Sequence, residues 1–242
     1  MAETYRIGTR TSPLALRQVE EVLGNLRKFY SGFKAEIVGI DTYGDRDKST
    51  PISEIEGTDF FTKEIDEALL NSLIDFAVHS AKDLQDKLKE GLVVAGTTFP
   101  IDPYDVLVSK SGLTLDDLPF GAKIGTSSKR RKEGLKKFRP DFQIVDIRGN
   151  IQERLRLVDS LSFIVDSYKL YTINHQPALD AIVIAAAGLM RLGLEERITQ
   201  RIPFEIITPH SLQGSLAVVT RKEDLELVKL LSVIDSQEVA LL

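Results

Sequence analysis

The sequence predicts an α/β fold with two lobes, each a mostly parallel sheet with flanking helices. Short runs of β-branched residues alternate with segments of helical periodicity, a pattern typical of α/β layers with parallel strands. A short repeated motif indicates that the chain has two similar halves. Ile-Gly-Thr at residues 7–9 ends one predicted strand and leads into a helix, and the same three residues at 124–126 do so again. Two such strand–turn–helix units would each begin one lobe.

Eight segments are predicted to be strands because they are short, rich in β-branched residues and bounded by turn residues. They are residues 5–9, 35–40, 76–79, 92–97, 105–108, 123–125, 143–146 and 180–185. Helices are predicted between them. One has apolar residues at Leu16, Val19, Leu23 and Leu26, the spacing of a helix with one buried side.

Three further segments complete the predicted elements. A helix is expected over residues 62–73, and a hairpin fits residues 163–173. The last helix is expected over residues 223–242, and its apolar side would be formed by Leu225, Val228, Leu231 and Val239.

Prolines mark the expected crossings between the lobes. Pro100 and Pro103 bracket the first crossing, and the return falls near Thr208-Pro209, because proline favours connections over regular elements. The predicted lobes are therefore residues 1–100 with 209–242, and residues 101–208.

Composition excludes several classes of protein. The net charge of −5 argues against nucleic-acid binding by bulk attraction, and no apolar run is long enough to span a membrane. There is no cysteine, and the three histidines, His79, His175 and His210, lack metal-ligand spacing, so no metal site is predicted. No glycine-rich nucleotide motif is present. We expect a cytoplasmic monomer without nucleic-acid or membrane partners.

Cations occupy three predicted helix starts, where the partial positive charge of the helix disfavours them. Arg10 lies just before Ser12, a predicted N-cap followed by proline. The second start is capped by Ser127 or Ser128. The third has Asn150 in a capping box with Glu153. The cations beside these two caps are Lys129, Arg130, Arg131, Arg148 and Arg154.

An anion at these helix starts would remove the electrostatic conflict, because backbone N–H groups and guanidinium groups would hold it together. A solvated basic surface is the alternative for any single arginine. Three starts with the same conflict favour an anion site at the carboxyl ends of the strands, where α/β sheets bind ligands. The ligand should carry several carboxylates or phosphates.

The segment 75–83 reads as a buried strand that ends in Ser-Ala-Lys-Asp. Lys82 and Asp83 could form an ordinary exposed pair, which would contribute little energy. Alternatively, Lys82 would bind a ligand carboxylate and Asp83 a donor or developing cation. The spacing alone leaves both interpretations open.

Six motifs together resemble one known family, porphobilinogen deaminase (hydroxymethylbilane synthase). They are RIGTRTSPLALRQVE, FFTKEIDEALL, DFAVHSAKDL, IGTSSKRR, DIRGN and DAIVIAAAGLMRLGL, in family order between residues 6 and 221. The resemblance implies two lobes built like type II periplasmic-binding proteins, with an active-site cleft between them. It also implies the condensation of four porphobilinogens, with loss of ammonia, in haem biosynthesis.

The resemblance carries roles over to individual residues. Asp83 would be the catalytic carboxylate, binding pyrrole N–H groups and stabilising an azafulvene-like cation. The positions matching those that bind the dipyrromethane primer are Ser80, Lys82, Thr126, Ser128, Arg130, Arg131 and Gly149. The positions matching those that bind substrate or the growing chain are Arg10, Ser12, Lys63, Arg148, Arg154, Arg191 and Gln213.

The chain departs from the family at the primer. Family members attach dipyrromethane to a cysteine in a third domain, and this sequence, which we expect to lack that domain, contains no cysteine. A primer would therefore be bound non-covalently or be absent. Two interpretations follow: a deaminase that holds its primer without a covalent bond, or a non-enzymatic or degenerate homologue that binds a polycarboxylated pyrrole ligand.

Overall fold

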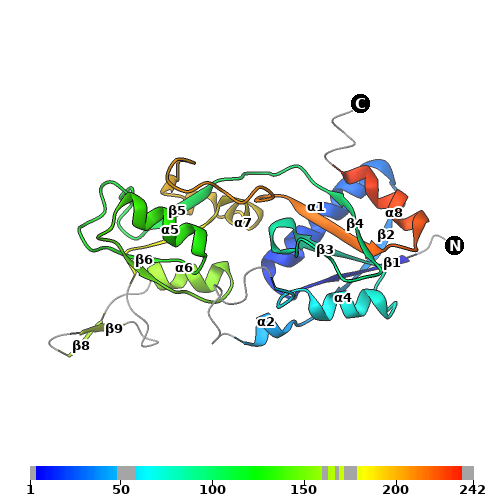
Figure 1. Ribbon diagram of the computed structural model, residues 1–242, viewed down its shortest axis with the longest axis horizontal. Coiled ribbons are helices and arrows are strands. Elements are labelled where there is room, and N and C mark those ends of the chain that lie inside the picture. The colour runs from blue at the N-terminus through cyan, green and yellow to red at the C-terminus, as the bar shows by residue number, and fades with distance from the viewer. Residues whose placement is uncertain (1–3, 48–57, 160–162, 167–168, 172–178, 236–242) are drawn as a thin grey trace. The chain divides into compact units, whose positions relative to one another are not determined.

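The computed structural model describes residues 4–47, 58–159, 163–166, 169–171 and 179–235. The chain forms two compact units (Figure 1). Unit 1 comprises Met1–Asp47, Gly57–Asp102 and Ser211–Leu242, and unit 2 comprises Lys48–Glu56 and Pro103–His210. Each unit has its own five-stranded sheet.

The sheet of unit 1 has the strand order β2-β1-β3-β12-β4. Strand β1 pairs in parallel with β2 and β3, whereas β12 pairs antiparallel with β3 and β4. Only β12 therefore runs against the other strands of this sheet. The strands are β1 (Thr4–Thr9), β2 (Lys34–Gly39), β3 (Phe76–Ser80), β4 (Leu92–Thr97) and β12 (Leu216–Arg221).

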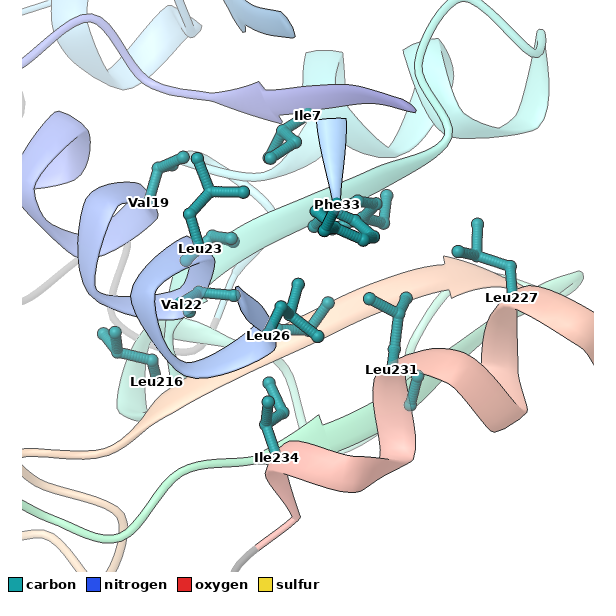
Figure 2. Packing of buried hydrophobic residues seen from close by; sticks show 14 residues of the cluster. Ile7, Val19, Val22, Leu23, Leu26, Phe33, Leu216, Leu227, Leu231 and Ile234 are labelled. Carbon is teal, nitrogen blue, oxygen red and sulfur yellow. The ribbon is translucent and has the colours of Figure 1, made fainter. Parts of the chain in front are cut away.

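Helices cover both faces of this sheet. On one face, α1 (Pro13–Phe29) and α8 (Leu225–Leu231) pack with the 3₁₀ turn Ser232–Ile234. The buried leucines of these helices, Leu23, Leu26, Leu227 and Leu231, point toward the strands (Figure 2). On the other face, α4 (Lys63–Leu70) packs against β3 and β12. A short helix, α2 (Tyr43–Arg46), follows β2.

Local sequence explains the start and orientation of α1. The Ser12 hydroxyl accepts a hydrogen bond from the Ala15 N–H at 3.3 Å, and proline occupies the first turn, where its missing N–H is harmless. Val19, Val22 and Leu26 are buried on one side of the helix. Burial of each such side chain contributes roughly 1.5–3 kcal/mol, so this apolar side fixes α1 on the sheet.

The sheet of unit 2 has the strand order β11-β5-β10-β6-β7. Strand β6 pairs in parallel with β7 and β10, whereas β5 pairs antiparallel with β10 and β11. Only β5 runs against the other strands. The strands are β5 (Asp105–Ser109), β6 (Lys123–Gly125), β7 (Gln143–Val145), β10 (Ala181–Ala185) and β11 (Gln200–Arg201).

Two apolar clusters lie on opposite faces of this second sheet. Helix α5 (Lys129–Phe138) contributes to one, and α6 (Ile151–Asp159) and α7 (Ala186–Arg191) contribute to the other. Strands β8 (Phe163–Asp166) and β9 (Lys169–Tyr171) pair antiparallel, which confirms the predicted hairpin there. Residues 167–168 and 172–173 of that prediction lie outside the described residues. Two 3₁₀ turns, Ala81–Asp83 and Glu195–Arg197, complete the elements.

The two sheets share the same order of parallel and antiparallel pairings. Read from β2 in unit 1 and from β7 in unit 2, the four successive pairings are parallel, parallel, antiparallel and antiparallel. Strands β1 and β6 occupy equivalent positions, and each carries one copy of the Ile-Gly-Thr motif at its end. The sequence echo therefore marks a structural repeat.

All eight predicted strands and both strands of the predicted hairpin are present, but two of the strands in the described residues were not predicted. Strand β12 is a continuous buried run whose partners, β3 and β4, lie more than a hundred residues earlier. Strand β11 has only two residues, too few to show a periodic pattern.

The predicted C-terminal helix was too long, and the placement of Leu225 on its apolar side was wrong. Helix α8 ends at Leu231, and the following turn ends at Ile234. Leu231 is buried and Val228 packs against the core, as predicted, but Leu225 is 74% exposed and Leu227 is buried in its place. The predicted contact of Val239 lies outside the described residues.

Candidate ligand-binding and active site

In unit 1, the predicted site residues gather where strands β1 and β3 end. These strands are parallel neighbours, so their carboxyl ends share one edge of the sheet. Arg10 and Ser12 follow β1, and Ser80 ends β3 and leads into the 3₁₀ turn that holds Lys82 and Asp83. The strand after Gln213 begins at the same edge, because Leu216 pairs with Ser80. Lys63, in contrast, is exposed at the start of α4.

Lys82 and Asp83 have different surroundings. The Lys82 ammonium lies 3.5 Å from the side-chain oxygen of Gln213, which is completely buried. Asp83 is exposed. The predicted roles suit this arrangement. Lys82, held next to the buried amide of Gln213, would bind a ligand carboxylate, and the exposed Asp83 would bind pyrrole N–H groups.

His79 lies beside these groups without adding a positive charge. Burial lowers the pKa of His79 to about 4, although Asp83 acts to raise it and Arg10 to lower it further. The imidazole is therefore neutral at neutral pH and does not cancel the charge of Asp83.

Arg10 is paired within the protein. Its Nε donates to both carboxylate oxygens of Asp45, at 3.1 and 3.2 Å, and its guanidinium lies 4.6 Å from the centre of the Phe61 ring. Burial would raise the pKa of Asp45, but hydrogen bonds from Arg10 and Thr42 keep it below its ordinary value. Asp45 thus supplies an anion at this helix start, and the charge conflict by itself requires no ligand.

Gln18 is a residue of this edge that sequence reasoning missed. It is 5% exposed on α1, and its side-chain amide donates to the Ser80 hydroxyl at 2.8 Å. A polar residue on the buried side of the helix, next to Val19, was the signal that could have found it.

In unit 2, Arg130 and Arg131 converge on one buried carboxylate. Asp105 has a fully enclosed side chain, with Arg130 at 2.8 Å and Arg131 at 2.7 Å. Burial would raise the pKa of Asp105, but the two guanidinium groups outweigh it and hold the pKa below its ordinary value. Sequence reasoning also missed Asp105, so here too the protein provides an anion to its own cations.

The start of α5 is set by two serines. Ser127 donates to the Ile147 carbonyl and accepts from the Ile147 N–H at 2.8 Å, which ties the end of β6 to the end of β7. Ser128 is the N-cap of α5, but its side chain makes no capping hydrogen bond. The side chain of the cap therefore leaves the first N–H groups of α5 available to an anion.

The predicted capping box at α6 is confirmed. The Asn150 N–H donates to Glu153 at 2.8 Å, and the Glu153 N–H donates to the Asn150 side chain at 2.9 Å. Gly149 has φ of +97°, and a Cβ there would lie 2.5 Å from a Glu153 oxygen, so only glycine fits. Arg154 donates to the Gly149 carbonyl at 2.9 Å, and Arg191 lies in the last turn of α7.

The described residues contain no group of metal-binding side chains, and none of their helices is long and apolar enough to cross a membrane.

Solved structures show the class of fold. The methionine-binding protein MetQ aligns with a TM-score of 0.50 at 17% identity, covering 98% of this chain and 92% of that one. A variant of the OxyR2 regulatory domain from Vibrio vulnificus aligns with a TM-score of 0.50 at 13% identity, covering 97% and 94%. The chain thus has two α/β lobes of the type II periplasmic-binding-protein class.

Sequence relatives identify the family. The family model described as "Porphobilinogen deaminase, dipyromethane cofactor binding domain" matches residues 5–229. The porphobilinogen deaminase of Syntrophus aciditrophicus is 44% identical over 222 residues, covering 92% of this chain and 67% of that protein. That of Paenibacillus macerans is 40% identical over 242 residues, covering 98% and 70%. The chain belongs to the porphobilinogen deaminase family, whose members are transferases of haem biosynthesis.

Proposed function

We propose that this chain is an active porphobilinogen deaminase that joins four porphobilinogens head to tail and releases one ammonia at each condensation. The observation that carries the proposal is the end of β3, where Asp83 is exposed beside Lys82, whose ammonium lies 3.5 Å from the buried Gln213. The neutral imidazole of His79 preserves the negative charge near Asp83.

Asp83 is proposed to act on the charge that develops on the substrate. Loss of ammonia from porphobilinogen leaves a positive charge shared by the methylene carbon and the pyrrole nitrogen. A carboxylate held in place for that charge lowers the barrier. The α-carbon of a second pyrrole then bonds to the methylene carbon and loses its proton, which restores both aromatic rings.

The cations are proposed to bind the carboxylates of the pyrroles. Each porphobilinogen bears one acetate and one propionate, which suit guanidinium groups and helix starts. We assign substrate or growing-chain contacts to Arg10, Ser12, Lys63, Arg148, Arg154, Arg191 and Gln213.

We propose that dipyrromethane binds non-covalently, since none of these 242 residues is cysteine. When bound, it supplies the pyrrole to which the first substrate is joined. The N-terminal N–H groups of α5 and the cations Arg130 and Arg131 beside them suit a carboxylate of such a group. The residues that would hold it are Ser80, Lys82, Thr126, Ser128, Arg130, Arg131 and Gly149.

The first test compares Asp83→Asn with the unaltered protein and with Asp86→Asn, a variant of a nearby exposed carboxylate. Each protein is incubated with porphobilinogen, the products are oxidised, and porphyrin absorption is recorded. We expect turnover by the unaltered protein and by Asp86→Asn, and a loss of roughly 100-fold or more in Asp83→Asn. Equal turnover by all three would contradict the role of Asp83.

A non-enzymatic homologue that binds a polycarboxylated pyrrole is the second candidate, and the lack of a cysteine favours it. Without a covalent bond, partly made chains could leave before they are complete. Porphobilinogen binding by the unaltered protein, measured calorimetrically, without any porphyrin would favour this candidate. A cytoplasmic monomer without nucleic-acid or membrane partners remains our prediction from the sequence.

A further inference from the structure

Two buried threonines end equivalent strands in the two units. Thr9 ends β1 and Thr126 follows β6, and each residue is 1% exposed. Within the described part of the chain, neither hydroxyl has a hydrogen-bond partner. A buried hydroxyl without a hydrogen bond is destabilising. Two such hydroxyls at matching positions therefore indicate that both have the same function.

The match between the two positions extends to strand register. In unit 1, Ile7 pairs with Ile37 and Gly8 with Val38. In unit 2, Ile124 pairs with Ile144 and Gly125 with Val145. Each threonine is thus the next residue of an equivalent parallel ladder.

Both threonine side chains lie on a sheet face that is covered by a helix. Ile7 packs in the cluster that contains the buried side of α1, and Ile124 packs with Leu135 of α5. Side chains two residues apart on a strand share a face, so Thr9 and Thr126 face the same helices where each strand ends and its helix begins. These helices have 17 and 10 residues, and their N-terminal N–H groups favour an anion.

We infer that Thr9 is a ligand-binding residue of unit 1 that donates its hydroxyl hydrogen to one carboxylate at the start of α1. Thr126 does the same for another carboxylate at the start of α5. The inference rests on the proposed function, whose pyrroles supply the acetate and propionate. It adds a residue of unit 1 to the predicted set and makes the two threonines a matched pair.

Replacing Thr9 by valine tests the inference, because the shape is kept and only the hydroxyl is lost. The probe is a pyrrole that bears the acetate and propionate but no aminomethyl group, so it binds without reacting. We expect its affinity to fall by about 10- to 100-fold, as for loss of a hydrogen bond to a charged group. We expect the Tm of the free protein to stay constant or rise, since an unsatisfied buried hydroxyl is removed. Thr126→Val should behave in the same way.

Thr220→Val is the matched control. Thr220 is completely buried in the same sheet as Thr9, but its hydroxyl donates to the Asp75 carbonyl at 2.8 Å. This variant should lower the Tm by roughly 2–4 °C and leave probe affinity unchanged.

The inference is overturned if Thr9→Val lowers the Tm as Thr220→Val does, or if its affinity for the probe matches that of the unaltered protein. Lack of probe binding by the unaltered protein also overturns it. Its failure is distinct from failure of the proposed function, which is measured by porphyrin formation. If the unaltered protein forms no porphyrin but binds the probe, and Thr9→Val binds it more weakly, the inference is supported and the proposed enzymatic activity is rejected.

Discussion

Asp66 and His79, both buried in unit 1, respond to pH in opposite senses. Burial raises the pKa of Asp66 to about 6, although Lys89 and Thr62 act to lower it. Between its ordinary pKa of 3.8 and about 6, the folded protein holds a proton that the unfolded chain releases. The contribution of Asp66 to the stability of the folded protein therefore falls as the pH rises through this range. His79, with its pKa lowered to about 4, acts in the reverse direction.

Asp66→Asn should separate the two contributions. Asparagine keeps the shape and can accept the Thr62 hydrogen bond, but it cannot ionise. We expect the variant to be more stable than the unaltered protein by about 1–3 kcal/mol at pH 7, with the difference shrinking toward pH 4. Chemical denaturation at several pH values measures it. Glu133→Gln, an exposed carboxylate on α5, is the control and should show no such trend.

At the helix starts, the sequence predicted the cations but not the carboxylates that pair with them. The cations were recognised because they contradict local electrostatics. Their carboxylate partners were not, because Asp45 lies 35 residues from Arg10 and Asp105 lies 26 from Arg131. Nothing in the local pattern joins residues so far apart.

At the level of elements, capping was the most dependable local signal. Ser12 and Asn150 cap α1 and α6 with the hydrogen bonds that their sequence context predicts. The reason is that a capping bond joins residues three apart, so it depends little on the rest of the fold.

Asn150→Ala should destabilise unit 2 through the loss of this cap. The expected cost is about 1 kcal/mol, or a Tm lower by roughly 2–4 °C, measured by calorimetry. Glu153→Gln is a suitable control, because glutamine can also complete a capping box, so it should leave the Tm almost unchanged. Equal Tm values for Asn150→Ala and the unaltered protein would show that the cap contributes nothing.

The apolar pattern of the last helix was less dependable than the caps. Leu225, Leu227, Val228 and Leu231 allow more than one apolar side in so short a helix. The cluster with α1 selects Leu227 and Leu231 (Figure 2). Packing against another element thus decided what the local spacing left open.

Across the whole molecule, the two units differ in how their strands are distributed along the sequence. All five strands of the sheet of unit 2 lie between residues 103 and 210. The sheet of unit 1 needs β12, which follows unit 2 in sequence and lies between β3 and β4. Unit 1 is therefore complete only after the chain returns.

Fragments should show this difference. We expect residues 103–210 alone to fold, because both apolar clusters and the whole sheet of unit 2 are included. Residues 1–102 alone should not fold, since β3 and β4 lose the strand between them. Circular dichroism during urea unfolding tests both fragments. A cooperative transition for residues 1–102 would contradict the prediction.

The sequence by itself determined the α/β class, eight of the strands and the β8–β9 hairpin, the caps and the family, because these depend on residues near one another and on recognisable motifs. Only the tertiary structure decided the place of β12, the apolar side of α8, and the partners Asp45 and Asp105. It also showed that the Ile-Gly-Thr echo marks equivalent strands with equivalent buried hydroxyls. These features depend on contacts between distant residues, which become neighbours only when the sheets and their cores assemble.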